Sequence, residues 1–167
     1  SIKSLDRTYD DNQNVVLLPL LYAVHLEKIG TTFRYRQRKD DNDQEYKELV
    51  EEMLSENSIH TYFSHIFRFH SYLNALSNEV KNISTHQVYK CDSDFVNDYL
   101  NDFLVESGIK SIDGHKAALS SYFNFLSHLG ICHSLELTIY RKSKQRAAEL
   151  DETRNVIKYI SREHRNL

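Results

Sequence analysis

The sequence predicts an all-α fold, a bundle of four to five helices with an inserted short helix and a C-terminal linker helix. Four glycines and one proline in 167 residues leave little turn chemistry for a many-stranded sandwich or barrel. A content of 40% hydrophobic and 27% charged residues suits amphipathic helices. Between residues 58 and 130, apolar residues recur three or four positions apart, which is the helical period.

Charge, cysteine usage and hydropathy exclude several classes of protein. The formal charge is −3 and the pI about 6.3, so the overall balance indicates neither a nucleic acid nor an acidic membrane as partner. Cys91 and Cys132 lack CxxC spacing, which favours reduced thiols in a cytoplasmic protein. The longest apolar run, residues 15–24, is about half the ~20 residues that a membrane span needs, so we expect no membrane partner.

The first half of the chain predicts an apolar helix, a loop and a short acidic helix. Pro19 suits the first turn of a helix and Gly30 suits its end. The residues expected to face the core are Leu20, Leu21, Val24 and Ile29. Residues 31–42 combine a basic and an acidic block without apolar pattern and predict a loop. Residues 43–55 repeat apolar positions at i, i+3, i+4, i+7 and i+8 and predict a short helix.

Three further helices are predicted from their apolar faces and end signals. A helix N-cap favours a short hydroxyl or carboxylate side chain, and a helix stop favours glycine. The expected caps are Ser58, Asp92 or Asp94, and Ser111, and the expected stops are Gly108 and Gly130. Each helix turns its apolar side chains to one face, so all of them can share one core.

The C-terminal part predicts an extended segment, a linker and a last helix. Residues 135–139 alternate apolar and polar residues, which indicates a short extended segment. Residues 141–150 begin with four cations that have no acid among them and no apolar face, so we expect an exposed basic interdomain linker. Asp151 is expected to cap a final amphipathic helix.

Two segments resemble a known domain. Residues 58–73 read Ser58-x-x-x-Tyr62-x-x-x-Ile66-x-x-Phe69-x-x-Tyr72-Leu73, and residues 108–130 read GIKSIDGHKAALSSYFNFLSHLG. The pair is similar to the SAM-like, or core-binding, N-terminal domain of tyrosine recombinases (phage integrases). That family has a helix of the type T-x-x-x-Y-x-x-x-L-x-x-F and a later helix of the type T-I-x-x-x-L-S-A-L-R-x-F-F-x-Y-L. The second match has no gap from Ser111 to Leu126.

The resemblance implies a domain organisation. Residues 1–140 would be a SAM-like DNA-binding domain with an insertion at about 31–57, residues 141–150 the basic linker, and residues 151–167 the start of a truncated catalytic domain. The chain departs from the family in this insertion. It also has Ser120 where the family has a basic residue.

The candidate DNA-binding residues lie on outward polar stripes, at helix N-termini and in the basic linker. Thr61, His65 and Arg68 are three or four residues apart, opposite the apolar face of their helix. Free N–H groups at a helix N-terminus attract phosphate oxygens, and an extended basic strand can follow a phosphate backbone. The full candidate set is Ser58, His60, Thr61, His65, Arg68, Ser111, His115, Lys116, Ser120, Arg141, Lys142, Lys144 and Arg146.

The sequence predicts no catalytic residue, cofactor or metal in this chain. His65 and Arg68 match the His-x-x-Arg pair of the recombinase catalytic domain, but no arginine box or nucleophile context accompanies them. His60, His65 and His70 are five residues apart, so they would fan around a helix rather than converge on a metal.

We therefore expect a sequence-specific DNA-binding domain that clamps the core site of a recombination reaction. Its partners would be double-stranded DNA, its own catalytic domain and other protomers. One alternative is a helical protein–protein interaction domain, supported by the net negative charge. Another is a self-contained enzyme built around His65 and Arg68.

Overall fold

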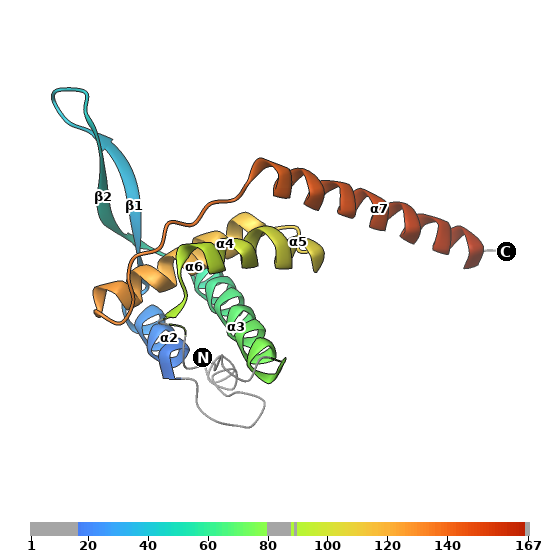
Figure 1. Ribbon diagram of the computed structural model, residues 1–167, viewed down its shortest axis with the longest axis horizontal. Helices are drawn as coiled ribbons and strands as arrows, with labels where there is room; N and C mark the ends of the chain where they lie inside the picture. The colour runs from blue at the N-terminus through green and yellow to red at the C-terminus, as the bar shows by residue number, and fades with distance from the viewer. Residues whose placement is uncertain (1–16, 80–87, 89, 166–167) are drawn as a thin grey trace. The chain divides into compact units, whose positions relative to one another are not determined.

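The structure, a computed structural model, describes residues 17–79, 88 and 90–165. It is mixed α/β, because two antiparallel strands accompany the helices, so the all-α prediction is wrong. The chain divides into two compact units. The hairpin unit is Ser1–Cys91 with Ala117–Glu136, and the C-terminal unit is Asp92–Lys116 with Leu137–Leu167. Figure 1 shows the elements in chain order.

The hairpin unit contains α2 (Leu17–Ile29), α3 (Glu56–Glu79) and most of α6 (Ile112–His128). Aromatic side chains from all three helices are buried, and Tyr22, Phe69 and Tyr122 are each almost completely enclosed. The Tyr22 and Tyr122 rings meet edge to face with centroids 5.1 Å apart. Edge-to-face pairs add to the free energy that the buried area contributes, so these rings anchor the core.

Helix α2 ends as predicted but faces the core with other residues. Gly30 adopts φ 68° and its N–H bonds to Leu26 O, which is the expected glycine stop. The predicted core stripe is wrong, because Leu21, Val24 and Ile29 are exposed. The residues that α2 buries include Tyr22, Ala23 and Leu26. The helix is apolar on nearly every side, so its periodicity does not select a face.

Helix α3 buries the predicted side but starts earlier. Tyr62, Ile66 and Phe69 are buried, as the periodicity predicts. The predicted cap at Ser58 is wrong, because α3 begins at Glu56 and the Ser55 hydroxyl accepts the N–H of Ser58 at 3.2 Å. Ser55 therefore satisfies a free N–H at this end of the helix.

Strands β1 (Thr31–Lys39) and β2 (Glu45–Met53) form an antiparallel hairpin that pairs Thr31 with Met53 and Lys39 with Glu45. The predicted loop at 31–42 and helix at 43–55 are therefore wrong. Cations at every second position of β1 lie on the same face as glutamates of β2, and these pairs favour the strands. The Arg38 guanidinium lies 3.0 Å from Glu48 Oε2.

A tight turn closes the hairpin. The Asp40 carboxylate accepts the N–H groups of Asn42 and Gln44 at 2.9 and 2.8 Å. Asp43 adopts φ 61°, a left-handed conformation that Asp tolerates better than most residues. The aspartate-rich stretch is thus the turn between two strands.

The C-terminal unit contains α4 (Ser93–Asp98), the π-helical turn η3 (Tyr99–Phe103), α5 (Leu104–Glu106), the first turn of α6 and helix α7 (Arg141–Arg165). Asp92 caps α4 by accepting the Phe95 N–H at 2.8 Å, which confirms one of the two predicted caps. Gly108 follows α5 with φ 73°, as predicted. The expectation that the last helix begins only at Asp151 is wrong, because α7 already begins at Arg141. The role of residues 141–150 as an interdomain linker stays a prediction.

Candidate nucleic-acid interface

Four cations occupy the first two turns of α7. They are Arg141, Lys142, Lys144 and Arg146, all exposed. The first turn of α7 carries no acidic residue. The N-terminus of a helix is the positive end of its dipole, so cations there are unfavourable unless an anion is near. The sequence thus places positive charge where the helix itself disfavours it.

Two buried asparagines hold the chain that enters this helix. Asn97 Oδ1 accepts the Thr138 N–H at 2.8 Å. Asn101 Nδ2 donates to Thr138 O at 2.8 Å, and Asn101 Oδ1 accepts the Tyr140 N–H at 2.8 Å. We call this arrangement the amide clasp. It fixes the backbone of residues 138–140 directly before α7. The start of α7, which carries the cations, therefore has a defined position in the C-terminal unit.

The amide clasp was not predicted from the sequence. The only sign of it in the sequence is that Asn97 and Asn101 are four residues apart, in a stretch where apolar pairs alternate with polar pairs. Asparagine disfavours helix interiors because its side chain competes for backbone groups. Two asparagines on one helical face therefore indicate backbone partners outside the helix.

Ion pairs divide the four cations into two kinds. Lys144 Nζ lies 3.1 Å from Asp113 Oδ1, and Arg146 lies 3.6 Å from Glu106 Oε1. Arg141 and Lys142 have no carboxylate within ion-pair distance among the residues that the structure describes. The uncompensated positive charge of this surface therefore lies at Arg141 and Lys142.

The Lys144–Asp113 pair also joins the first turns of α7 and α6. Ser111 directly precedes α6, is exposed, and its carbonyl accepts the His115 N–H at 3.4 Å, which puts it at the predicted capping position. Two helix N-termini are therefore neighbours in the C-terminal unit. Such ends attract the oxygens of phosphate groups.

Three other candidates on α6 differ in accessibility. The His115 side chain is buried, so it does not belong to an exposed stripe. Lys116 and Ser120 are partly exposed. Lys116 lies in the C-terminal unit, whereas Ser120 belongs to the hairpin unit.

The predicted stripe on α3 is a separate candidate surface, because it lies in the hairpin unit. Of its residues, His60, Thr61 and Arg68 are exposed, while Ser58 and His65 are partly exposed. The Thr61 hydroxyl donates to a backbone carbonyl of its own helix at 2.8 Å. Burial lowers the pKa of His65, and the nearby Arg68 lowers it further, so the neutral imidazole is favoured.

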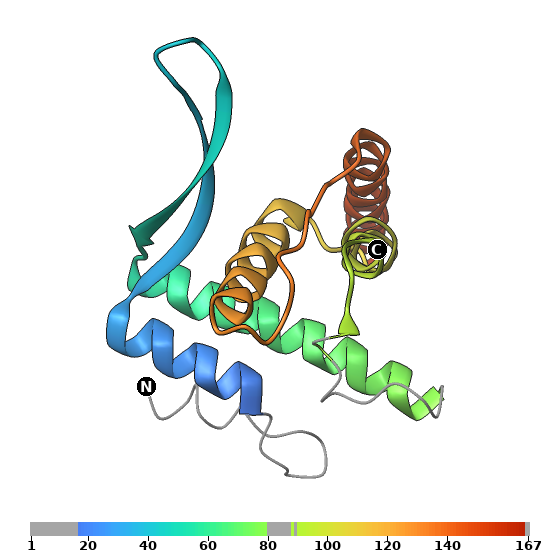
Figure 2. The same ribbon diagram turned by 60° about the vertical axis from the view of Figure 1, so that its left-hand side comes forward.

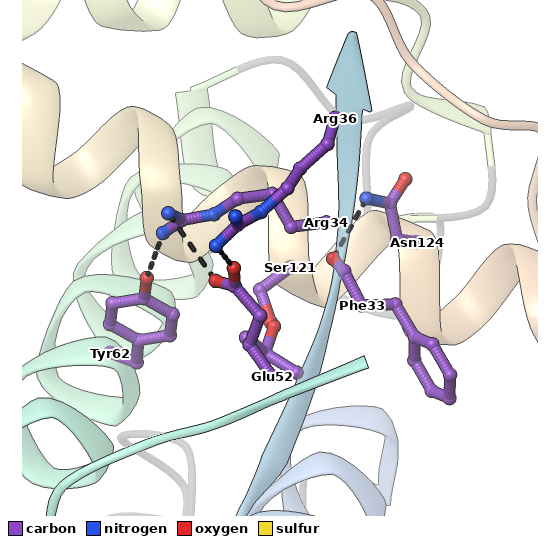
Figure 3. A network of polar contacts seen from close by, with 8 residues as sticks. Phe33, Arg34, Arg36, Glu52, Tyr62, Ser121 and Asn124 are labelled. Carbon is purple, nitrogen blue, oxygen red and sulfur yellow. Dashed lines mark hydrogen bonds and ion pairs between the residues drawn. The ribbon is translucent and has the colours of Figure 1, made fainter. Parts of the chain in front are cut away.

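Two arginines of β1 form ion pairs with a glutamate of β2 (Figure 3). Arg34 lies 3.5 Å from Glu52 Oε2 and donates to the Tyr62 hydroxyl at 3.5 Å. Arg36 also pairs with Glu52. The β2 glutamates thus neutralise these arginines, and Arg34 links β1 to both β2 and α3.

A hydrogen-bond network anchors the base of the hairpin. Ser121 on α6 shares hydrogen bonds with Thr32 and with Tyr22, the latter at 2.6 Å. Asn124 Nδ2 donates to Phe33 O at 3.2 Å, as Figure 3 shows. This network was not predicted, because a serine and an asparagine on an amphipathic helix carry no local sign of long-range partners.

The described residues contain no group of three or more His, Cys, Asp or Glu side chains that could hold a metal ion. None of the described helices combines the length and the apolar character needed to cross a membrane. Comparison with known proteins identified no matching family model, no matching curated protein and no matching solved structure.

Proposed function

We propose that this chain binds double-stranded DNA, with the first two turns of α7 as the main phosphate contact. The observation that carries the proposal is the pair Arg141 and Lys142, two exposed cations without carboxylate partners among the described residues, at a helix N-terminus. Each such cation costs roughly 0.3–1 kcal/mol in the isolated protein. A phosphate backbone would reverse this cost, because it supplies the anion that the helix end favours.

The geometry of the C-terminal unit supports a backbone contact. The amide clasp fixes the residues before α7, and the Lys144–Asp113 pair brings the first turn of α6 next to that of α7. Two helix ends, together with two cations that have no carboxylate partner in the described part of the chain, suit neighbouring phosphates of one strand. Such contacts position a protein on DNA, whereas sequence specificity needs side chains that reach base edges.

We further propose that the chain is the core-binding part of a tyrosine-recombinase-type integrase. The support is the resemblance of residues 58–73 and 108–130 to that family, together with exposed polar residues opposite the buried face of α3. On this proposal, strand cleavage belongs to a catalytic domain with its own arginine, histidine and tyrosine residues. The protein would act in the cytoplasm, with other protomers, on paired DNA sites.

Salt dependence of duplex binding tests the DNA proposal. Fluorescence anisotropy with a labelled duplex, repeated between about 50 and 200 mM salt, gives the slope of log affinity against log salt. The double variant Arg141→Gln/Lys142→Gln is expected to lower the magnitude of that slope by roughly 1.8, since each phosphate contact contributes about 0.9.

The matched control is Lys28→Gln/Lys90→Gln, which removes the same charge from exposed positions of the hairpin unit. We expect it to leave the slope nearly unchanged. An unchanged slope in the Arg141/Lys142 variant would show that these two cations of α7 do not contact DNA phosphates. Absence of duplex binding at low salt would favour a protein-interaction domain instead.

A further inference from the structure

The hairpin extends away from α2 and α3, and residues 34–49 are exposed on both of its faces (Figure 2). Tyr35 and Leu49 face each other across the strands and are 48% and 42% exposed. We call this hairpin, residues 31–53, the arm. A two-stranded hairpin is marginally stable on its own. An arm that leaves a cross-strand apolar pair in water therefore favours a partner that covers it.

The charge of the arm favours a protein over DNA. Residues 31–53 carry five cations and seven carboxylates. Asp40, Asp41 and Asp43 lie at the tip, and all three are exposed. A duplex repels such a tip, because its phosphates carry the same charge.

Among the described residues, the hydrogen-bond pattern leaves both outer edges of the arm open from residue 35 to residue 49. Asp40 N–H bonds to Gln44 O at 3.0 Å, and Leu54 N–H bonds to Gly30 O at 2.7 Å, so backbone groups of the even-numbered residues point into the hairpin. Those of the odd-numbered residues point outward, and Phe33 O accordingly accepts from Asn124 on α6. Beyond Phe33, no hydrogen bond to the outward backbone groups of the arm is found within the described part of the chain.

We propose that the arms of two copies of this chain join edge to edge, β1 of one copy against β2 of the next. The register is the one that the hairpin already uses. In that register the outward groups of residues 35, 37 and 39 meet the outward groups of residues 49, 47 and 45 of the neighbour, so each pair can exchange hydrogen bonds.

Side chains match along the same register. Arg36, which already faces Glu48 of its own copy, would also face Glu48 of the neighbouring copy, and Lys39 would likewise face Glu45 of the neighbouring copy. Rows of alternating charge would therefore continue from one copy to the next. Tyr35 meets a second Leu49, which extends the apolar pair into a row and covers both side chains. None of the rows from residue 35 to residue 39 brings two like charges together.

Joints between identical edges are less favourable. Two β1 edges centred on Gln37 place Arg36 against Arg38 twice. Two β2 edges place Lys47 against Lys47, or Glu48 against Glu48, depending on their centre. Like charges directly opposite each other destabilise a strand pair. The charge pattern therefore selects a head-to-tail contact, which forms rings or open chains.

Sedimentation velocity over a range of concentrations tests the proposal with the whole chain. We expect the average mass to rise above the monomer value of 19.7 kDa as concentration increases. Gln37→Pro removes an outward N–H and leaves the inward ladder intact, since proline is tolerated where the strand N–H faces solvent. This variant is expected to stay monomeric, whereas Gln37→Thr associates like the parent chain.

Hydrogen exchange at the Arg36 and Arg38 amides verifies that Gln37→Pro keeps its hairpin. A parent chain that stays at the monomer mass at every concentration would overturn the proposal. So would association of Gln37→Pro, with its hairpin intact, as strong as that of the parent.

Cross-linking separates the head-to-tail joint from the symmetric ones. In a background with Cys91→Ala and Cys132→Ala, Gln37→Cys and Lys47→Cys are prepared as two separate proteins. A short bis-maleimide is expected to give the mixed product faster than either self-linked product, because Gln37 of one copy would lie about 5 Å, one strand spacing, from Lys47 of the next copy and about 10 Å from its Gln37. Self-linking of Gln37→Cys without mixed product would contradict the joint. Gln37→Pro should bind duplex DNA with the parent salt slope, so this proposal and the DNA proposal fail independently.

Discussion

Asn101 lies in the π-helical turn η3, and its Nδ2 donates to Thr138 O at 2.8 Å, 37 residues further along the chain. The same Nδ2 also donates to Asn97 O at 2.9 Å. A π-helical turn inserts an extra residue into a helix, which turns the side chains that follow it to a new direction. The widened turn and the buried amide together fix the extended chain that leads into α7.

We predict that Asn101→Ala lowers the free energy of unfolding by about 2 kcal/mol. It removes the hydrogen bonds to Asn97 O, Thr138 O and the Tyr140 N–H, and each contributes about 0.5–1.5 kcal/mol net. Urea unfolding measures the change, and hydrogen exchange at the Tyr140 amide should become faster. Asn155→Ala is the control, an exposed asparagine on α7 whose loss should change stability by less than about 0.5 kcal/mol. Equal effects of the two variants would deny the clasp a role in stability.

Two glycines with the same backbone conformation differ in what surrounds them. Gly108 and Gly130 have φ 73° and 72°, so alanine costs roughly 1–2 kcal/mol of backbone strain at either position. An added Cβ at Gly130 has no atom of the described residues within 4 Å, whereas at Gly108 it collides with the Arg154 guanidinium. That guanidinium ends a flexible side chain, so it can move away at the cost of its 3.2 Å hydrogen bond to Gly108 O.

Gly108→Ala should therefore destabilise the protein more than Gly130→Ala, by about 0.5–1.5 kcal/mol, the net contribution of one hydrogen bond. Thermal or urea unfolding of both variants measures the difference. In an Arg154→Ala background the two glycine substitutions should cost the same. A difference that persists there would assign the effect to something other than Arg154.

The hydroxyl of Ser121 is predicted to couple energetically to Tyr22. Ser121→Ala leaves the buried Tyr22 hydroxyl without its 2.6 Å partner, for a loss of about 1–3 kcal/mol. Tyr22→Phe removes that unsatisfied group, so it should cost clearly less in the Ser121→Ala background than in the parent chain. A double-mutant cycle from urea unfolding gives the coupling energy, expected in the range of about 0.5–3 kcal/mol. Additive costs would show that the two hydroxyls act independently.

The lowered pKa of His65 predicts that the protein loses stability in mild acid. Burial lowers its folded-state pKa, and Arg68 lowers it further, so the unfolded chain takes up a proton at higher pH than the folded chain does. This contribution to stability is fully present above the unfolded pKa of about 6.5 and is lost as pH falls through the folded pKa. Urea unfolding at neutral and mildly acidic pH should show a smaller decrease in His65→Gln than in the parent chain.

The exposed His60→Gln serves as the control for the acid experiment and is expected to follow the parent. Arg68→Gln removes the neighbouring cation, so the pKa of His65 should rise toward its ordinary value while burial still holds it lower. NMR titration of the His65 ring in the parent and in Arg68→Gln measures that shift. A pH dependence identical in His65→Gln and the parent would contradict the prediction.

The sequence alone determined the parts of the fold that depend on neighbours within a few residues. The cap at Asp92, the helix start after Ser111 and the turns at Gly108 and Gly130 follow from local hydrogen bonds and from φ angles that glycine adopts without strain. The buried face of α3 follows from its regular apolar period.

The hairpin was decided by contacts between segments. The spacing of Tyr46, Leu49 and Met53 fits a helix, yet all three remain exposed in the strand. What selects the strand is the match of β1 cations with β2 glutamates and the anchoring of its base by Ser121. Such pairs join residues from 10 to 89 positions apart in the chain. A helical period relates only residues three or four positions apart, so it does not reveal these pairs.

The start of α7 and the buried face of α2 were likewise decided by tertiary structure. Arg141 begins a helix ten residues before the expected cap at Asp151, because the amide clasp holds the preceding chain and Lys144 and Arg146 find carboxylates on α6 and α5. Tyr22 faces the core because its hydroxyl meets Ser121, a partner that hydropathy does not represent. Local propensity and periodicity limit where an element can form, and long-range polar partners choose among the faces and ends that remain.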